Sequence, residues 1–283
     1  MENSETPISA TFRKEKIRRV AGDLEVTDLF PETLKDEVPI IIIPGWGETP
    51  ATHKDTLNTI ATLGRRAIAI KIPRLGGARS EGGYPRSEYN KALALIDTLN
   101  KKGLRKVDLI AHSEGAIQAI IAALNNPERF RGIVFVDPAG LTGKDSTVKL
   151  ATRFVSMLAK DARRMVKAPG DKKVNMLRAA AEATKYFLSN PPRGVQEANA
   201  VSAADIYEML TVLKEVGIKV AIIHGVDDSI FPMKKLLETA LERDGVETMG
   251  FYAVKGDHRE ISVHPEKYAA LAVNALEDIT KRT

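Results

Sequence analysis

The stretch "DLIAHSEGA", residues 108–116, places a serine between a strand-like apolar run and a helix-like run. A sharp turn at this junction would present the hydroxyl of Ser113 at the carboxyl end of the strand, where open α/β sheets bind ligands. Such a turn needs small residues two positions before and two after the serine, and Ala111 and Gly115 meet this need. Ser113 is therefore a candidate nucleophile. A serine that only caps the next helix fits equally well, so this stretch alone leaves both interpretations open.

A serine nucleophile needs a histidine base and a carboxylate that orients the imidazole. The histidines that follow Ser113 are His224, His258 and His264. "VAIIHGVDDSIFP" places Asp227 and Asp228 just after a strand-like run, and "FYAVKGDHRE" places His258 after the next one. Because the carboxyl ends of parallel strands meet at one edge of a sheet, a serine, an aspartate and a histidine can come together there.

The segments that must position these residues alternate between strand-like and helix-like patterns. Apolar runs typical of strands buried on both faces occur in "VPIIII", "AIAIKI", "KVDLIA", "GIVFV", "KVAII" and "MGFYAV". Stretches such as "SEYNKALALIDTLNKKG" have helical periodicity and lie between the runs. The alternation predicts an α/β fold with a mostly parallel central sheet flanked by helices. Two extended segments with a turn at Gly22 and Asp23 precede it.

Residues 141–205 interrupt this alternation, because they have helical patterns but no strand-like apolar run. We predict one core domain formed by residues 1–140 and 206–283, with residues 141–205 inserted as a helical cap or lid. Most apolar stripes at helical spacing pack in cores, but some of those in the insertion should line a substrate pocket. The candidate substrate-binding residues are Trp46, Phe154, Met157, Leu158 and Phe187. The many Lys and Arg residues of the insertion form a solvated face or attract an anionic substrate.

Composition excludes several classes of protein and site. The formal charge of +5 is mild, and no cluster of basic residues with interleaved aromatics predicts a nucleic-acid partner. The absence of cysteine excludes disulfides and thiolate metal sites, and no spacing of His, Asp and Glu predicts another metal site or a cofactor. No apolar run approaches the roughly 20 residues of a membrane helix. The polar start "MENSETPISATFRKEK" lacks the apolar stretch of a signal peptide, so we expect a cytoplasmic protein.

Several stretches together resemble the α/β-hydrolase superfamily, in a form with a helical cap, and the resemblance covers nearly the whole chain. The stretches that carry it are "IIIIPGWGETP", "IKIPRLGGARSEGG", "AHSEG", "IKVAIIHGVDDSIFP" and "GDHREISVHPEKYAALAVNAL". The resemblance implies that Ser113 is the nucleophile, His258 the base and Asp228 the acid.

The register of the resemblance selects among the candidates. In many family members a proline follows the histidine by seven positions, and Pro265 stands in that relation to His258 and not to His264. "GVDDSIFP" fits the family's G-x-x-D-x-x-x-P with Asp228 as its aspartate.

Other residues carry alternative interpretations. Asp227 is a second choice for the acid, and Asp137 is a third, since it ends the strand before the insertion, where some family members keep their acid. We expect His112 to have a structural role beneath the turn of the serine. His224 is expected to be a buried, hydrogen-bonded histidine, and His53 is expected to lie at the surface.

The resemblance also implies an oxyanion hole formed by the backbone N–H groups of Trp46 and Glu114. We expect the Glu114 side chain to be solvated or ion-paired. Pro44 stands where the family usually has a histidine, but it removes neither donor. The aspartate usual in the second loop is missing, and Lys71 and Arg74 lie there instead.

These features predict a serine hydrolase that cleaves a carboxylic ester or a related acyl bond through an acyl-enzyme. The expected partner is a small-molecule acyl substrate with an apolar acyl part, without nucleic acid and without integral membrane association. Thioester and C–C bond hydrolysis on the same triad are alternatives. A protein that retains the fold for ligand binding or sensing is an alternative from another class. The sequence does not determine the oligomeric state.

Overall fold

The strands of the molecule form a single, mostly parallel sheet. The computed structural model describes residues 11–17, 24–71, 86–243 and 249–281. Within these ranges the strand order is β1-β2-β4-β3-β5-β6-β7-β8. The strands are β1 (Thr11–Ile17), β2 (Leu24–Phe30), β3 (Asp36–Ile43), β4 (Arg65–Lys71), β5 (Val107–His112), β6 (Phe130–Val136), β7 (Lys219–Gly225) and β8 (Gly250–Val254). Strands β3 to β8 are parallel, whereas β1 and β2 pair in antiparallel fashion, so the predicted mostly parallel sheet is confirmed.

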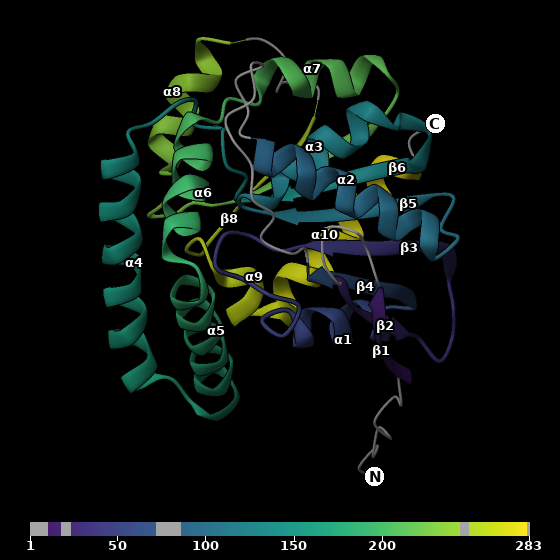
Figure 1. The fold of residues 1–283 in the computed structure, drawn as a ribbon, viewed down its shortest axis with the longest axis horizontal. Helices are drawn as coiled ribbons and strands as arrows, with labels where there is room; N and C mark the ends of the chain where they lie inside the picture. Colours follow the sequence, from purple (N-terminus) through teal and green to yellow (C-terminus); the bar gives the residue numbers. More distant parts are fainter. Residues whose placement is uncertain (1–10, 18–23, 72–85, 244–248, 282–283) are drawn as a thin grey trace.

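Helices cover both faces of this sheet (Figure 1). One face carries α1 (Lys54–Thr62), the short α9 (Glu260–Val263) and α10 (Pro265–Lys281). The other face carries α2 (Arg86–Lys101), α3 (Gly115–Asn125), α7 (Tyr207–Glu215) and α8 (Met233–Leu241). This two-sided cover confirms the predicted fold class. The predicted turn at Gly22 and Asp23 and the second-loop residue Arg74 lie outside the described residues.

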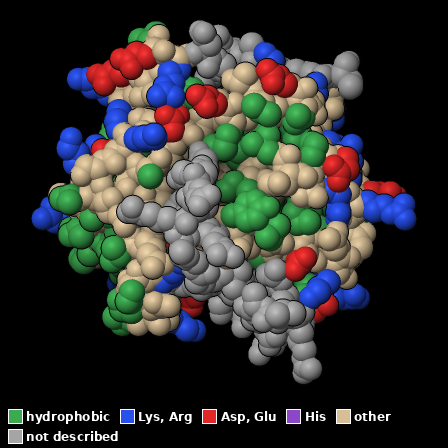
Figure 2. Space-filling view, turned by 45° about the horizontal axis from the view of Figure 1, so that its top comes forward, with side chains coloured by type: hydrophobic (Ala, Val, Ile, Leu, Met, Phe, Trp, Pro, Cys, Tyr) green, Lys and Arg blue, Asp and Glu red, His purple; other side chains and the backbone are tan. Residues whose placement is uncertain are grey.

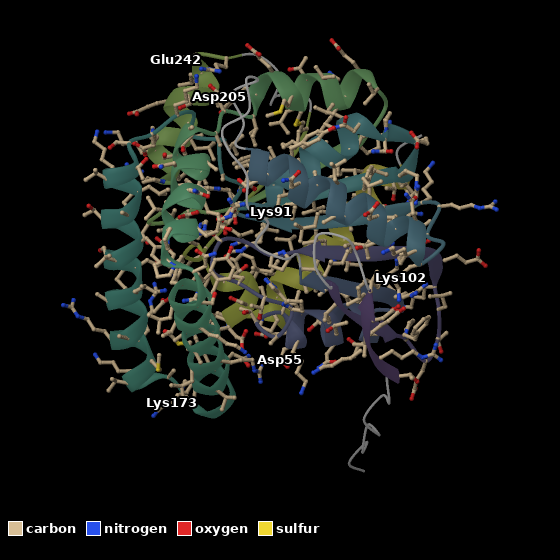
Figure 3. The ribbon with its side chains drawn as sticks, in the orientation of Figure 1. Asp55, Lys91, Lys102, Lys173, Asp205 and Glu242 are labelled. Atoms are coloured by element: carbon tan, nitrogen blue, oxygen red, sulfur yellow. The ribbon has the colours of Figure 1, made fainter. Side chains whose placement is uncertain are left out.

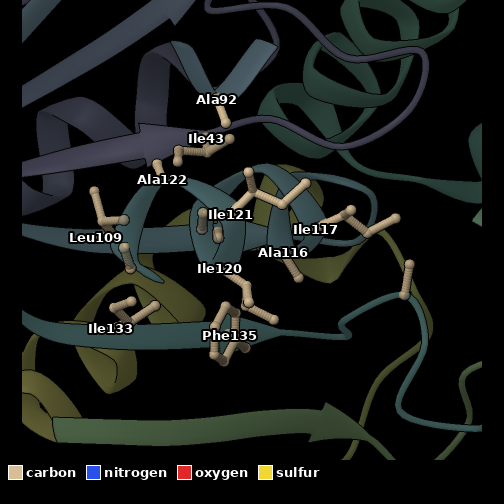
Figure 4. Packing of buried hydrophobic residues seen from close by; sticks show 14 of the residues in the cluster. Ile43, Ala92, Leu109, Ala116, Ile117, Ile120, Ile121, Ala122, Ile133 and Phe135 are labelled. Carbon is tan, nitrogen blue, oxygen red and sulfur yellow. The ribbon is translucent and has the colours of Figure 1, made fainter. Parts of the chain in front are cut away.

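The apolar run of β3 shows why a buried parallel strand loses the usual alternation of apolar and polar residues. Ile41 and Ile43 belong to the core on the side of α2 and α3, whereas Ile40 and Ile42 belong to the core on the side of α1 and α10. Figure 4 shows Ile43 among the apolar side chains of α3 and the neighbouring strands. Burying each such side chain contributes about 1.5–3 kcal/mol, so the run stabilises both layers at once.

Three helices lie between β6 and β7 in the chain: α4 (Thr147–Lys167), α5 (Gly170–Ser189) and α6 (Pro191–Ala203). We call them the three-helix segment. They stand together beside one end of the sheet (Figure 1). Leu150, Phe154 and Val201 of this segment line a cavity together with Ser113, which follows β5. The segment therefore faces the carboxyl end of the central strands.

Charged side chains of both signs lie along the periphery of the face drawn in Figure 2, and apolar side chains gather nearer its middle. The positive charge excess is thus not concentrated in one basic patch on that face. Among the helices of the described ranges, none combines the length and the apolar character that a membrane span requires.

Candidate active site

The backbone at Ser113 makes a strained turn between β5 and α3. Its φ is 51°, in the left-handed region that residues with a side chain rarely adopt. Two hydrogen bonds hold it there: the Ser113 N–H donates to the carbonyl of Val136 at 3.0 Å, and its carbonyl accepts from the N–H of Ala139 at 3.1 Å. A Cβ at Gly115 would lie 2.6 Å from the carbonyl oxygen of Ile43, so the turn requires glycine there.

The fold brings together the three residues that the sequence selected. The Oγ of Ser113 lies 3.0 Å from Nε2 of His258, and Nδ1 of His258 lies 2.8 Å from Oδ2 of Asp228. With the proton on Nδ1, the imidazole donates to the aspartate and accepts from the serine. All three residues are buried, being 3–6% exposed. The three side chains therefore form one hydrogen-bonded chain from the Ser113 hydroxyl to the Asp228 carboxylate.

The local backbone and the contact with His258 keep Asp228 ionised. Its Oδ1 accepts hydrogen bonds from the N–H groups of Ile230 at 2.7 Å and Phe231 at 2.9 Å. Burial opposes the charge of Asp228, but the interaction with His258 and the hydrogen bonds prevail and lower the pKa of Asp228. A carboxylate in this state can stabilise an imidazolium.

The other candidate acids are placed differently. Asp227 is exposed, and its backbone N–H donates to the carbonyl of Gly256. Asp137 is fully buried, and its Oδ1 accepts from the N–H of Gly225 at 2.7 Å. Burial and the nearby charge of Asp228 raise the pKa of Asp137 well above its usual range. Through its bond to the Gly225 N–H, Asp137 ties the end of β6 to β7.

His224 is buried as predicted. Its Nε2 lies 2.9 Å from the carbonyl of Phe231, and burial lowers its pKa. Its Nδ1 lies 3.4 Å from the Oδ1 of Asp137. Asp137, His224 and Asp228 together place possible metal-ligand atoms within 4.8 Å of one another, a cluster that their spacing in the chain did not reveal.

Glu48 is a buried residue that the sequence did not single out. Its Oε2 accepts from the N–H of Gly45 at 2.9 Å, from Nε2 of His53 at 2.9 Å and from Nδ1 of His112 at 2.7 Å. The prediction of a surface position for His53 is wrong, because this pairing allows the ring to be fully buried. Only the unusual carboxylate in "PGWGETP" could have signalled such a network.

His112 continues the network to the loop of the candidate base. Its Nε2 lies 2.8 Å from the backbone carbonyl of His258. Burial opposes its charge, but Glu48 prevails and raises the pKa of His112, so both ring nitrogens can donate. Burial likewise opposes the charge of Glu48, whose pKa the two histidines lower well below the usual range. The expected structural role of His112 agrees with these contacts.

The backbone N–H groups of Trp46 and Glu114 make no hydrogen bond to any residue that the structure describes. Both stand beside Ser113: Glu114 follows it directly, and Trp46 follows Gly45, whose added Cβ would lie 2.9 Å from Cβ of Ser113. The expected ion pair of Glu114 exists, since its Oε1 lies 2.7 Å from Nζ of Lys91. Two uncommitted donors therefore stand next to the hydroxyl.

A small cavity of about 30 Å³ lies over Ser113 and His258, and we call it the apolar chamber. Its apolar walls include Trp46, Leu150, Phe154, Met157, Ile230 and Phe231. The sequence analysis named three of these residues as substrate-binding and missed Leu150, Ile230 and Phe231. The ring of Phe231 lies 5.1 Å from that of His258.

Two predicted lining residues lie outside the apolar chamber. Phe187 packs against the ring of Trp46, with centroids 4.8 Å apart, and Trp46 also packs against Phe154 at 4.8 Å. Leu158 is 36% exposed and lines a different cavity within the three-helix segment. Helical spacing identified the inward face of α4, but not which of its residues point at Ser113.

Comparisons with known proteins agree with this architecture. Residues 38–240 match a family model described as "alpha/beta hydrolase fold". The "Putative non-heme haloperoxidase" of Mycobacterium phage D29 is 23% identical over 261 residues, which cover 88% of this chain and 91% of that protein. The bromoperoxidase from Bacillus anthracis superposes with a TM-score of 0.67 at 17% identity, covering 95% of this chain and 100% of that one. A thermophilic esterase from Thermogutta terrifontis gives 0.64 at 17% identity, covering 95% and 99%.

Proposed function

Since the chain belongs to the α/β-hydrolase fold family, we propose that it is a serine hydrolase that cleaves a carboxylic ester or related acyl bond. The observation that carries this proposal is the hydrogen-bonded chain from Ser113 through His258 to Asp228. A lone serine hydroxyl is a weak nucleophile near neutral pH, and this chain supplies the base that activates it.

In the proposed reaction, Nε2 of His258 takes the proton of the Ser113 hydroxyl as Oγ attacks the acyl carbon. Asp228 fixes the imidazole and stabilises the imidazolium that forms. His258 then protonates the leaving oxygen as the bond to it breaks, which leaves an ester of the acyl group on Ser113. A water molecule, deprotonated by His258, hydrolyses that ester and restores the serine.

We assign the oxyanion hole to the backbone N–H groups of Trp46 and Glu114. Their lack of other partners among the described residues supports the assignment. Each donor of this kind contributes about 2.7–4 kcal/mol to the transition state. The bond from Glu48 to the Gly45 N–H fixes the loop that carries one donor, and His112 links that loop to the carbonyl of His258.

We also propose that residues 141–205 form a cap on a core domain made of residues 1–140 and 206–283. The contacts of α4 and α6 with the apolar chamber support this division. The aromatic and aliphatic walls suit an apolar part of a small-molecule substrate, and they exclude water from the reacting atoms.

The test is hydrolysis of short p-nitrophenyl esters by the wild type, Ser113→Ala and Ser156→Ala. Ser156 is an exposed serine of α4, so its substitution is a matched control. We expect Ser113→Ala to lose turnover by at least about 10³-fold and Ser156→Ala to retain it. Wild-type turnover by Ser113→Ala would refute the proposed nucleophile. Thioesters with the same acyl groups, assayed in parallel, decide between ester and thioester hydrolysis.

A further inference from the structure

A second and larger cavity lies on the other side of the loop that carries Gly45. Its volume is about 220 Å³, more than the roughly 150 Å³ that holds a benzene ring in a protein core. Its walls include Gly45, Glu48, Lys91, Glu114, Gln118 and Tyr186. We call it the polar cavity. Among the described residues, only Glu48 lines both this cavity and the apolar chamber.

A charged cluster forms one wall of the polar cavity. Nζ of Lys91 lies 2.7 Å from Glu114, 3.1 Å from Glu88 and 3.3 Å from Glu197, so it forms ion pairs with three carboxylates. Arg193 lies 3.8 Å from Glu197, and all five residues are buried. Figure 3 shows Lys91 in the interior, where α2 faces the three-helix segment.

The charges of this cluster compensate one another. Burial raises the pKa of Glu114 well above its usual range, and the charges of Glu88 and Glu197 add to that effect, against the opposing charge of Lys91. The two cations of the cluster, Lys91 and Arg193, are both paired with its carboxylates. This wall therefore offers no free positive charge to an anionic ligand.

Unpartnered polar atoms point to what the cavity holds. Gln118 is only 4% exposed, and its amide has no hydrogen-bond partner among the described residues. It lies one helical turn after Glu114 on α3, on the same face of that helix. Oε1 of Glu48 is also buried without a partner within the described ranges. Buried polar groups are almost always hydrogen-bonded, so an amide left open in a cavity indicates a ligand that both donates and accepts.

The direction of the reaction assigns the cavity to one half of the substrate. His258 must protonate the leaving group, which therefore lies on the side of Ser113 where His258 stands. The acyl substituent extends away from His258. Gly45 and Glu114 border Ser113, and both line the polar cavity.

We propose that the polar cavity is the acyl subsite and that Gln118 makes it select neutral acyl groups bearing an amide or a hydroxyl. This inference rests on the proposed function of Ser113 as nucleophile. It differs from the sequence analysis, which expected an apolar acyl part.

The test compares three p-nitrophenyl esters of similar length with one leaving group: the apolar heptanoate, the N-acetyl-γ-aminobutyrate with its neutral amide, and the anionic hydrogen adipate. We expect kcat/KM of the wild type for the amide ester to exceed that for heptanoate about tenfold. Gln118→Leu should bring that ratio to about one, because an amide group of the substrate then lacks its partner. Gln118→Met, an unbranched replacement, serves the same purpose if the leucine variant does not fold.

Asn274→Leu is the matched control, because it makes the same kind of change at an exposed position of α10 and should keep the tenfold ratio. A wild-type preference for heptanoate, a ratio that survives both Gln118 variants, or a preference for the adipate ester would overturn the acyl subsite while leaving ester hydrolysis by Ser113 intact. If the wild type cleaved no ester at all, the proposed function and this inference would both fall.

Discussion

The apolar chamber and the polar cavity lie on opposite sides of one loop, yet they bury charge in opposite ways. The walls of the apolar chamber are mostly aliphatic or aromatic, and its ionisable lining residues are Glu48, His112, Arg259 and His258, which bonds to Asp228. Beside the polar cavity, Lys91 stands among three carboxylates. The difference indicates two tasks: the first arrangement concentrates charge where a reaction needs it, and the second neutralises charge to support a binding wall. Substitutions beside the apolar chamber should therefore lower catalysis, whereas substitutions in the charged cluster should lower stability.

The largest expected effect is a loss of kcat caused by a substitution beside the apolar chamber. Asp228→Asn should lower kcat about 10⁴-fold, because the imidazole loses both its orientation and its counter-charge. Asp137→Asn is the matched change and should cost less than about tenfold, since Asp137 bonds to the backbone of Gly225 rather than to the imidazole of His258. The measurement is kcat on one ester, with circular dichroism to verify folding. A greater loss in the Asp137 variant would show that the acid is misassigned.

In the charged cluster beside the polar cavity, a substitution is expected to lower the free energy of unfolding. Lys91→Met leaves Glu88 and Glu197 buried without their shared cation, which should lower the free energy of unfolding by about 3–5 kcal/mol. Lys234→Met, which breaks an exposed pair with Glu238, should cost under about 1 kcal/mol. Urea unfolding of both variants gives the two values. Equal losses would mean that the cluster does not support the fold in the way its burial indicates.

Within the three-helix segment, the comparison is between two faces of α4. One face carries Phe154 and lines the apolar chamber, and the other carries Leu158 and lines another cavity. Phe154→Ala removes a wall of the apolar chamber and should lower kcat/KM for p-nitrophenyl esters about tenfold. Leu158→Ala removes a side chain that lines another cavity and should change kcat/KM less than about twofold. Steady-state kinetics on one ester tests the pair. If Leu158 mattered more, the segment would have to sit differently over Ser113.

The smallest expected effect is a pH dependence of stability from the Glu48–His112 pair. The folded-state pKa of His112 is raised, so its contribution is fully present below its usual pKa of 6.5 and is lost as pH rises through the folded value. Glu48 has a lowered pKa, so its contribution is present above its usual 4.5 and is lost in acid. The stability advantage of the wild type over His112→Gln should thus shrink as pH rises above 6.5. The loss should be about 1.4 kcal/mol for each pH unit over which only the folded protein holds the proton. Urea unfolding across this range would contradict the pairing if the advantage stayed constant.

The fold and the grouping of Ser113, Asp228 and His258 at one sheet edge could be predicted because their signals are local. Each apolar run marks a strand, and Ser113, Asp228 and His258 each follow one, so a parallel sheet brings them to one edge. Pro265 then distinguished His258 from His264.

The residues that the sequence missed or misplaced depend on distant partners. Glu48 and His112 are 64 positions apart, and no local sequence pattern around either residue predicts the hydrogen bond between them. His53 has no partner that the sequence reveals, so a surface position was predicted for it. In the structure it is bonded to the Glu48 carboxylate and buried. The charged cluster joins α2, the start of α3 and α6, so its members look like separate surface charges in the sequence. The pairing of these buried charges with one another becomes visible only when the tertiary packing is known.

The account's central claim is that Ser113 is a live nucleophile, and covalent labelling tests it most directly. Wild-type protein treated with a fluorophosphonate and weighed by intact-protein mass spectrometry should gain one adduct per chain, located on the peptide that contains Ser113. Ser113→Ala should gain none. An unlabelled wild type, or equal labelling of both proteins, would contradict the claim.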